Sequence, residues 1–589
     1  MAFSDFFWHG IVAKVVITVT VLLAPIAAET IELDFSIGWV TANPDGLYDR
    51  PTIGVNGQWP IPLIEATVGD RLILHVTNDL GNASTSLHFH GLFQNGTNHM
   101  DGATGIVQCP IPPGESFTYD FKFDQPGTYW YHAHNDGQYP EGLRGPVIIH
   151  DPEGPYEGEY DEELLITFSD WYHRSMKDLI ADFISFKNPT GAEPVPDSAL
   201  MNDTQNFQVK VQPGKTYLIH MVNMGAFAAQ YIWFEGHTMR IVEVDGVWTE
   251  AADADMIYMT PAQRYSVLLT TKNDTSENFA IVGAMDQDLF DVLPEGLNPN
   301  VTGWLVYDES KPLPEPALLD KLDAFDDVKL VPTDGEELFE NVDYSFQLDV
   351  KMDNLGDGAN YAFFNDLTYV GPKVPSLYTA LSVGSGNSTN PSVYGTNTIS
   401  HVLEHNQVIE IVLNNADPGK HPFHLHGHNF QVVYRSEEEA GVFIDHEGIS
   451  LPKVPMRRDT LFVQPNGNFV IRYRSDNPGV WLFHCHIEWH MVQGLIATII
   501  EAPEAIQGLE IPDDHLRVCK TAGIATSGNA AGNTQDVFDL AGENAPVHAL
   551  PAGFTTKGYI AMVFSCVAGV LGIIVISWYG ALDLKTKEG

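Results

Sequence analysis

Cysteine is scarce in this sequence: the 589 residues include only Cys109, Cys485, Cys519 and Cys566. A chain of this length with so few cysteines does not depend on a disulfide framework to form its core. The length instead allows about three or four ordinary domains. With 44% hydrophobic and 18% charged residues, the composition is typical of a folded globular protein rather than a disordered one.

Basic residues are also scarce, with 30 Lys+Arg against 77 Asp+Glu and a formal net charge of -47. Such a charge repels phosphate backbones and attracts cations, so nucleic acid is excluded as a partner. The sequence also lacks a G-x-S-x-G nucleophile motif, a Walker phosphate-binding loop and a zinc-site motif. These absences disfavour hydrolases of that type and nucleotide-driven enzymes.

Long apolar runs stand out only near the two ends of the chain. Residues 1–28 combine Lys14, a short apolar core and the small residues Ala27 and Ala28, which predicts a cleaved secretory signal peptide. The shortness of that core disfavours a retained anchor. Residues 558–581 are almost free of charge and, at about 1.5 Å per residue, are long enough to cross roughly 30 Å of hydrocarbon. A charged tail, 582–589, follows, whereas a lipid-anchor signal normally ends in its hydrophobic tail.

These segments together predict a single-pass type I membrane protein with an extracellular body and a cytoplasmic tail. The plasma membrane is the expected location, although the helix alone does not distinguish it from a vacuolar membrane. Six N-x-S/T sequons favour a translocated glycoprotein. They begin at Asn82, Asn95, Asn202, Asn273, Asn300 and Asn387.

Between the two apolar segments the sequence predicts an all-β protein. Short alternating runs such as 71–77, 116–123 and 468–474 are separated by Gly, Pro, Asn and Asp, which is typical of sandwiches or barrels. A weak repeat begins near Thr67, Val211 and Leu403, each copy containing a turn, a strand and an Asn-containing loop, and it indicates three copies of one sandwich. We therefore expect domains at 29–150, 151–310 and 325–505, followed by an irregular stalk at 506–557.

Histidine is concentrated in four His-x-His pairs. Because residues i and i+2 of a strand point to the same face, each pair presents two imidazoles together. One such pair is usually unremarkable, but eight converging imidazoles suit a borderline-soft metal such as copper. The pairs are His88/His90, His132/His134, His424/His426 and His484/His486.

The strongest single signal is the segment His484-Cys485-His486-Ile-Glu-Trp-His490. Strand alternation directs the Cys485 side chain to one face and its two histidine neighbours to the other. One tripeptide can therefore ligate a metal on each side. With His490 and with His421 from "HPFHLHGH", Cys485 forms a His₂Cys set typical of electron-transfer copper sites.

The motifs "HFHG", "YHAH", "HPFHLHGH" and "HCHIEWHMVQGL" occur in this order, and with them the sequence from about Glu29 to Ala502 resembles the multicopper oxidases. The resemblance implies three cupredoxin-like Greek-key domains and four copper ions, one of type 1, one of type 2 and two of type 3. It assigns His421, Cys485 and His490 to type 1 copper and His88 and His424 to type 2. The type 3 pair is assigned His90, His132, His134, His426, His484 and His486.

Two further expectations concern Leu495 and the remaining cysteines. Leu495 stands at the axial position of the type 1 site, where some members of the family carry Met, so the copper is expected to be three-coordinate with a raised potential. A simple packing role for Leu495 is equally compatible. We expect Cys109 to pair with Cys519, because Cys566 falls in the membrane helix and Cys485 is assigned to the metal.

The surroundings of the type 1 histidines look acidic: Asp417 lies four residues before His421, close enough along the chain to reach that ring. The segments "NPTGAEPVP", which contains Glu193, and "AMDQDLFDVLP", which contains Asp291, further resemble the fungal cell-surface ferroxidases that work with an iron permease. The expected reductant is therefore ferrous iron. That resemblance implies that Glu193, Asp291 and Asp417 bind Fe(II) and couple it to the type 1 histidines, while Cys485 passes electrons onward for the reduction of O₂ to water. Carboxylates hold ferric ion more tightly than ferrous ion, which makes the electron easier to remove.

Two other functions remain open at this stage. A laccase-type oxidase of phenols or aromatic amines has the same fold and copper set, and a copper-storage or adhesion protein would have no activity. The acidic stretch Asp320, Asp323, Asp326 and Asp327 is compatible with passing ferric ion to a partner, but we favour a solvated linker.

Overall fold

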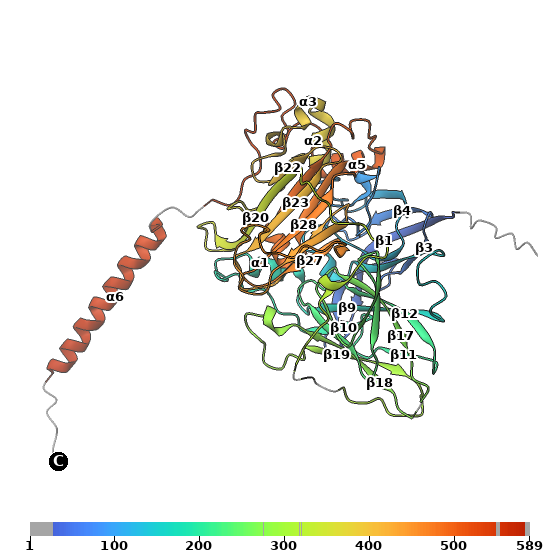
Figure 1. The fold of residues 1–589 in the computed structure, drawn as a ribbon. Helices are drawn as coiled ribbons and strands as arrows, with labels where there is room; N and C mark the ends of the chain where they lie inside the picture. Colours follow the sequence, from blue (N-terminus) through green and yellow to red (C-terminus); the bar gives the residue numbers. More distant parts are fainter. Residues whose placement is uncertain (1–27, 275, 317–318, 320, 549–553, 583–589) are drawn as a thin grey trace, which may run out of the picture.

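The computed structural model describes residues 28–274, 276–316, 319, 321–548 and 554–582. The expected signal peptide (except Ala28), Asp320 and most of the charged tail lie outside these residues. The strands of the described residues form six sheets, which pair into three sandwiches that appear in blue, green and yellow-to-orange in Figure 1. The predicted all-β architecture with three sandwiches is confirmed.

The first sandwich packs the sheet β2-β1-β4-β6 against the sheet β3-β8-β7-β5. Its strands are β1 (Thr30–Ala42), β2 (Arg50–Val55), β3 (Ile64–Thr67), β4 (Arg71–Asn78), β5 (His88–His90), β6 (Ser116–Lys122), β7 (Gly127–His132) and β8 (Arg144–His150). Two 3-10 turns, η1 (Asn98–Met100) and η2 (Tyr139–Glu141), lie in its loops.

The middle sandwich packs the sheet β10-β9-β12-β17-β14-β15 against the sheet β11-β19-β18-β13-β16. Its strands are β9 (Glu162–Trp171), β10 (Ser198–Met201), β11 (Gln208–Lys210), β12 (Thr216–Asn223), β13 (Gln230–Phe234), β14 (Met239–Val244), β15 (Val247–Ala254), β16 (Ile257–Met259), β17 (Arg264–Thr270), β18 (Phe279–Met285) and β19 (Asn300–Val306). The helix α1 (Met176–Phe183) follows β9, and the turn η3 (Gln287–Leu289) follows β18.

The third sandwich packs the sheet β21-β20-β23-β28-β25-β26 against the sheet β22-β30-β29-β24-β27. Its strands are β20 (Tyr344–Asn354), β21 (Asn360–Phe364), β22 (Ser400–Leu403), β23 (Val408–Asn415), β24 (His421–Leu425), β25 (Phe430–Arg435), β26 (Arg457–Arg458), β27 (Thr460–Val463), β28 (Asn468–Arg474), β29 (Gly479–Cys485) and β30 (Ile496–Glu501). Its short helical elements are η4 (Asp327–Lys329), α2 (Ser376–Ser382), α3 (Ser385–Ser388), η5 (Pro391–Tyr394) and α4 (Glu488–Val492).

The repeat seen in the sequence has a structural cause. Its three strands are β4, β12 and β23, and each pairs in parallel with the first strand of its own sandwich, β1, β9 or β20. Each ends in a buried asparagine, Asn78, Asn223 or Asn415, whose side-chain amide donates to two backbone carbonyls outside its own strand. The repeated asparagine therefore satisfies backbone groups that burial would otherwise leave unpaired.

The segment after β30 differs from the expected irregular stalk. The helix α5 (Asp513–Ala522) packs on β6: Asp514 accepts from the Thr118 backbone N–H at 2.9 Å, and the His515 ring stacks on Phe117 at 3.7 Å. Further along, Glu543 accepts from Thr396 near η5. The expectation of a stalk beginning at residue 506 is therefore wrong, because side chains of this segment bind the first and third sandwiches.

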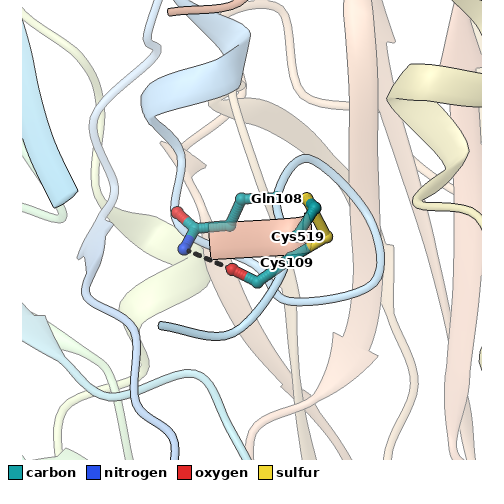
Figure 2. The surroundings of a disulfide bond; sticks show 3 residues. All are labelled: Gln108, Cys109 and Cys519. Atoms are coloured by element: carbon teal, nitrogen blue, oxygen red, sulfur yellow. Dashed lines mark hydrogen bonds between the residues drawn. A yellow bond between two sulfur atoms is a disulfide. The ribbon is translucent and has the colours of Figure 1, made fainter. Parts of the chain in front are cut away.

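A disulfide fixes this arrangement covalently. Cys109 of the first sandwich and Cys519 of α5 are bonded across 410 residues, with their Cα atoms 5.2 Å apart. Figure 2 shows the bond, with the Gln108 side chain donating to the Cys109 carbonyl at 3.1 Å. The predicted pairing is confirmed, and Cys485 and Cys566 are free.

The last described element is α6 (Thr556–Ala581), capped by the Thr555 hydroxyl, which accepts from the Gly558 N–H. None of its residues is buried (Figure 1). Among the described residues it is the one helix long and apolar enough to cross a membrane, with a mean hydropathy of 2.6 over its most apolar window. An exposed apolar helix of this length is consistent with a membrane anchor.

The double variant Cys109→Ser/Cys519→Ser tests the role of the disulfide. Because a crosslink that closes a long loop restricts the unfolded chain, its removal should cost about 2–5 kcal/mol. We expect a lower midpoint in thermal unfolding and faster proteolysis between β30 and α5. The matched control is Cys566→Ser, which removes a free thiol. Unchanged proteolysis in the double variant would show that α5 is held without the bond.

Candidate metal centre

Eight buried histidines gather at the contact between the first and third sandwiches. The strand β5 carries both histidines of its pair, and β7, β24 and β29 each carry the first histidine of another pair at or near the strand end. In the part of the chain that the structure describes, the middle sandwich adds no histidine to this cluster. We call these residues the histidine cluster: His88, His90, His132, His134, His424, His426, His484 and His486.

Strand pairing brings the four pairs together. The register sets His88 opposite His132 in β5 and β7, and His424 opposite His484 in β24 and β29. Between the sandwiches, the rings of His90 and His424 stack with centroids 3.7 Å apart. The rings of His88 and His426 stack at 4.1 Å. The cluster is therefore formed equally by two domains.

The free ring nitrogens of the cluster fit bound metal. Nε2 of His88, His132, His134 and His424 and Nδ1 of His90 are buried without a hydrogen-bond partner among the described residues. The Nε2 atoms of His426 and His484 lie only 3.1 Å apart. A buried nitrogen without a hydrogen-bond partner destabilises the fold. The presence of several such nitrogens in one place therefore indicates that they are ligands for an ion.

The opposite nitrogens of the same rings are held by hydrogen bonds. His88 Nδ1 donates to the Asp101 carbonyl at 2.6 Å, and His424 Nδ1 donates to the Asp459 carbonyl at 3.0 Å. Such bonds fix the tautomer and direct the other nitrogen inward. Burial and neighbouring imidazoles hold the pKa of His90 well below its ordinary value, so the neutral, metal-binding form is favoured.

A second cluster contains the buried Cys485 with His421 and His490. The Cys485 Sγ lies 3.4 Å from His490 Nδ1 and 3.9 Å from His421 Nδ1, and the two nitrogens are 3.0 Å apart. Burial raises the pKa of the Cys485 thiol, but the two histidines outweigh burial and lower the pKa to about 7. A cysteine that forms its thiolate easily, together with two imidazoles, is a ligand set that suits copper.

Cys485 connects its own cluster to the histidine cluster through its two neighbours in the sequence. Its thiol contacts His421 and His490, whereas the adjacent His484 and His486 belong to the histidine cluster. The opposed directions follow from strand alternation at the end of β29. One peptide segment therefore joins both clusters through covalent bonds.

The outer edge of the Cys485 cluster is acidic. Glu193, in the loop between α1 and β10, accepts from His490 Nε2 at 2.7 Å. Asp417, in the loop that Asn415 caps, lies 3.1 Å from His421 Nε2. Partial burial and the nearby charges of Glu193 and Asp417 raise the pKa of Asp291.

Several other acidic residues of the described chain are already paired. Asp286, in the same loop region as Asp291, binds Lys420 Nζ at 2.7 Å and accepts from the Tyr258 hydroxyl. Asp327 is buried against Arg435 and Arg458. The favoured interpretation of a solvated linker is therefore wrong for Asp327, and its charge is not free to bind iron. Asp326 also binds Arg435, and exposed Asp323 binds Lys321.

A cleft of about 1700 Å³ reaches the histidine cluster at His134. Its walls include the polar residues Asn135 and Gln138 and the apolar residues Leu482 and Met491. It gives small molecules a route to one side of the cluster.

Some functional residues escaped the sequence analysis. Asp101 accepts from His426 Nδ1 at 2.8 Å, and Asp459 lies 3.4 Å from both His90 Nε2 and His424 Nδ1. Neither occupies a ligand motif, so only the three-dimensional contacts reveal them. Leu495 is fully buried, and its carbonyl accepts from the Cys485 N–H at 3.2 Å.

Models of the multicopper oxidase family match residues 36–154, 162–310 and 369–505. The iron transport multicopper oxidase fetC of Epichloe festucae is 60% identical, covering 96% of this chain and 92% of its own length. FET3 of Saccharomyces cerevisiae, an iron transport multicopper oxidase, is 49% identical over 96% of this chain and 90% of its own.

Solved structures agree with these relatives. The crystal structure of Fet3p, a multicopper oxidase that functions in iron import, superposes with a TM-score of 0.85 at 48% identity, covering 88% of this chain and 99% of that one. The laccase of Botrytis aclada superposes with a TM-score of 0.73 at 28% identity, covering 84% and 92%.

Cys485→Ser tests the second cluster. Serine is close in size but offers a hard hydroxyl in place of a soft thiolate, so we expect the variant to lose copper from this cluster and to keep the ions at the histidine cluster. Metal analysis of the purified protein, together with its visible absorption, measures this. A variant with undiminished copper and unchanged absorption would contradict the assignment of Cys485 as a ligand.

Proposed function

The chain belongs to the multicopper oxidase family, and from this premise we propose that it is a ferroxidase for high-affinity iron uptake. In the proposed reaction four Fe(II), four protons and one O₂ give four Fe(III) and two water molecules. The names of the relatives from Epichloe festucae and Saccharomyces cerevisiae, iron transport multicopper oxidases, support an iron substrate.

The proposed ligand set holds four copper ions. His421, Cys485 and His490 bind the type 1 ion, and His88 and His424 bind the type 2 ion. Bound copper supplies one-electron redox chemistry and the site at which dioxygen is reduced. The type 3 pair is held by His90, His132, His134, His426, His484 and His486.

The observation that carries the proposal is the pair of carboxylate contacts at the Cys485 cluster. Glu193 and Asp417 come from different sandwiches, yet each contacts the outer nitrogen of one histidine ligand, His490 or His421. A ferrous ion held by these carboxylates and Asp291 would be connected to the Cys485 cluster through the single hydrogen bond between each carboxylate and its histidine. Cys485 and its peptide neighbours then link this cluster to the histidine cluster.

The same carboxylates favour iron over an aromatic substrate. Hard oxygen ligands stabilise Fe(III) more than Fe(II), which lowers the energy needed to remove the electron. A phenol gains nothing from three anionic groups. The net charge of -47 also raises the local concentration of cations.

Buried Glu488 is suited to supply a proton for water formation. It lies in α4, two residues after His486 of the histidine cluster, and its Oε1 atom has no hydrogen-bond partner within the described chain. Burial, with a smaller contribution from Asp136, raises its pKa to about 8, so the carboxyl group holds a proton at neutral pH. The cleft beside His134 provides the path for O₂ and water.

Two features fit delivery of the product at a membrane. The apolar helix α6 anchors the body, which we place outside the plasma membrane as a single-pass type I protein. Ferric ion hydrolyses and precipitates, so a permease in the same membrane is the proposed acceptor. Leu495, as a non-ligating axial residue, is proposed to keep the type 1 potential high enough for iron oxidation.

The variants Glu193→Ala, Asp291→Ala and Asp417→Ala test the iron site. Each removes one charged contact worth about 1.5–3 kcal/mol, so we expect kcat/KM for Fe(II) to fall about 10- to 100-fold. Oxidation of an aromatic amine, measured as oxygen consumption in parallel, should be retained. Glu295→Ala, an exposed carboxylate in the loop of Asp291, is the matched control.

Two outcomes would contradict this proposal. Iron oxidation that survives all three substitutions would remove the iron-site assignment. A wild-type protein that oxidises the aromatic amine far more efficiently than Fe(II) would identify a laccase-type oxidase instead.

A further inference from the structure

One buried guanidinium contacts all three sandwiches. Arg264, the first residue of β17 in the middle sandwich, is fully buried. Its Nε donates to the Thr128 carbonyl of the first sandwich at 3.0 Å. Its Nη1 and Nη2 donate to the two carboxylate oxygens of Asp459 in the third sandwich, at 2.8 and 2.6 Å. The fork geometry of this pair is one that only arginine provides.

Asp459 carries this contact to the histidine cluster. Its Oδ1 lies 3.4 Å from His90 Nε2 and 3.4 Å from His424 Nδ1, and its backbone carbonyl accepts from the same His424 nitrogen at 3.0 Å. The hydroxyl of the adjacent Thr460 donates to Oδ1 at 2.8 Å and lies 3.4 and 3.3 Å from the same two nitrogens. These contacts hold the outer nitrogens of two stacked rings, one from each ligand-bearing sandwich.

The glycine of the "HFHG" motif leaves room for this pair. A Cβ atom on Gly91 would lie 2.5 Å from Arg264 Nη2 and 2.8 Å from Asp459 Oδ2, closer than real contacts allow. Gly91 also has a φ of +90°, a conformation that other residues rarely adopt. The backbone directly after His90 is thus shaped to admit the guanidinium.

We propose that Arg264 is a positioning residue for the histidine cluster: through Asp459 it fixes the tautomer and orientation of His90 and His424. With Nε2 of His90 and Nδ1 of His424 held outward, Nδ1 of His90 and Nε2 of His424 face the metal. The middle sandwich, which supplies none of the proposed copper ligands, thereby sets the affinity of the cluster. This inference rests on the copper assignments of the proposed function but not on iron as the substrate.

A purely structural ion pair is the competing explanation, and Arg458 provides the matched control. Arg458 is also fully buried between the middle and third sandwiches, where its Nε binds Asp245 at 2.7 Å and its Nη1 binds Asp327. Within the described residues its guanidinium makes no hydrogen bond to the Asp459 carboxylate or to the histidine cluster. Loss of either arginine weakens the domain contact, but only loss of Arg264 should disturb the ligands.

The test compares Arg264→Lys with Arg458→Lys in copper-loaded protein. Lysine keeps the charge but cannot bind both carboxylate oxygens in a fork. For Arg264→Lys we expect the Kd of type 2 copper, measured by competition with a chelator and followed by its electron paramagnetic resonance signal, to rise about 10- to 100-fold. The blue absorption of the Cys485 cluster should persist. Lysine at position 458 keeps a positive charge beside Asp245, which both arginines contact, and leaves the Arg264–Asp459 fork intact. Arg458→Lys should therefore leave that Kd within about twofold of wild type.

The proposal is overturned if Arg264→Lys binds type 2 copper like the wild type. The proposal is equally overturned if both lysine variants weaken type 2 copper binding by the same factor, or if the blue absorption of Arg264→Lys disappears in parallel. If Arg264→Lys does not fold, the variant Asp459→Asn provides the test, because asparagine keeps the shape of the side chain and loses its charge. A selective loss of type 2 copper from that variant supports the positioning role, and an unchanged copper affinity refutes it. Copper readouts keep this test independent of whether Fe(II) or an aromatic amine is the substrate.

Discussion

The alternation of side chains at the end of β29 is the constraint on which the rest of this structure depends. Because adjacent residues of a strand point to opposite faces, Cys485 contacts His421 and His490, while His484 and His486 join the histidine cluster. Two metal clusters are thereby joined by a few covalent bonds. In the proposed function the acidic edge receives the substrate on one side, and the cleft at His134 admits dioxygen on the other. Substrate oxidation and oxygen reduction are separated in space but connected through the chain.

The three sandwiches contribute different numbers of residues to the two clusters. The first and third supply the histidine cluster, and the third supplies the Cys485 cluster. The middle sandwich contributes indirectly: the loop after its first strand brings Glu193 to His490, and its buried Arg264 binds Asp459 behind His90 and His424. The segment after β30 closes the assembly, since α5 packs on β6 and is bonded to Cys109. Each of these contacts joins residues far apart in the sequence, so the histidine cluster and the acidic edge form only when the sandwiches are assembled.

The sequence predicted those features that arise from local patterns. Alternating strands, the repeated asparagine of β4, β12 and β23, the His-x-His pairs and the tripeptide around Cys485 all follow from short-range periodicity. The carboxylates Glu193 and Asp291 were identified only through a family resemblance, because a single acidic residue among 77 carries no local signal. Arg264 and Asp459 are 195 residues apart and match no motif, so their pairing could not be predicted. The expectation of an irregular stalk at 506–557 was wrong because the composition of this segment, rich in Ala, Gly and Asn, does not reveal the contacts of α5. Asp327 was likewise misinterpreted, because its arginine partners are more than 100 residues away.

The most direct test of this account is anomalous diffraction at the copper edge from crystals of the copper-loaded protein. The account predicts one copper peak bonded to Cys485 Sγ, His421 and His490, and a separate group of peaks bonded to the histidine cluster, with His484 and His486 among its ligands. A single metal bound by Cys485 together with either neighbouring histidine would contradict it, because the cysteine would then not bridge two centres.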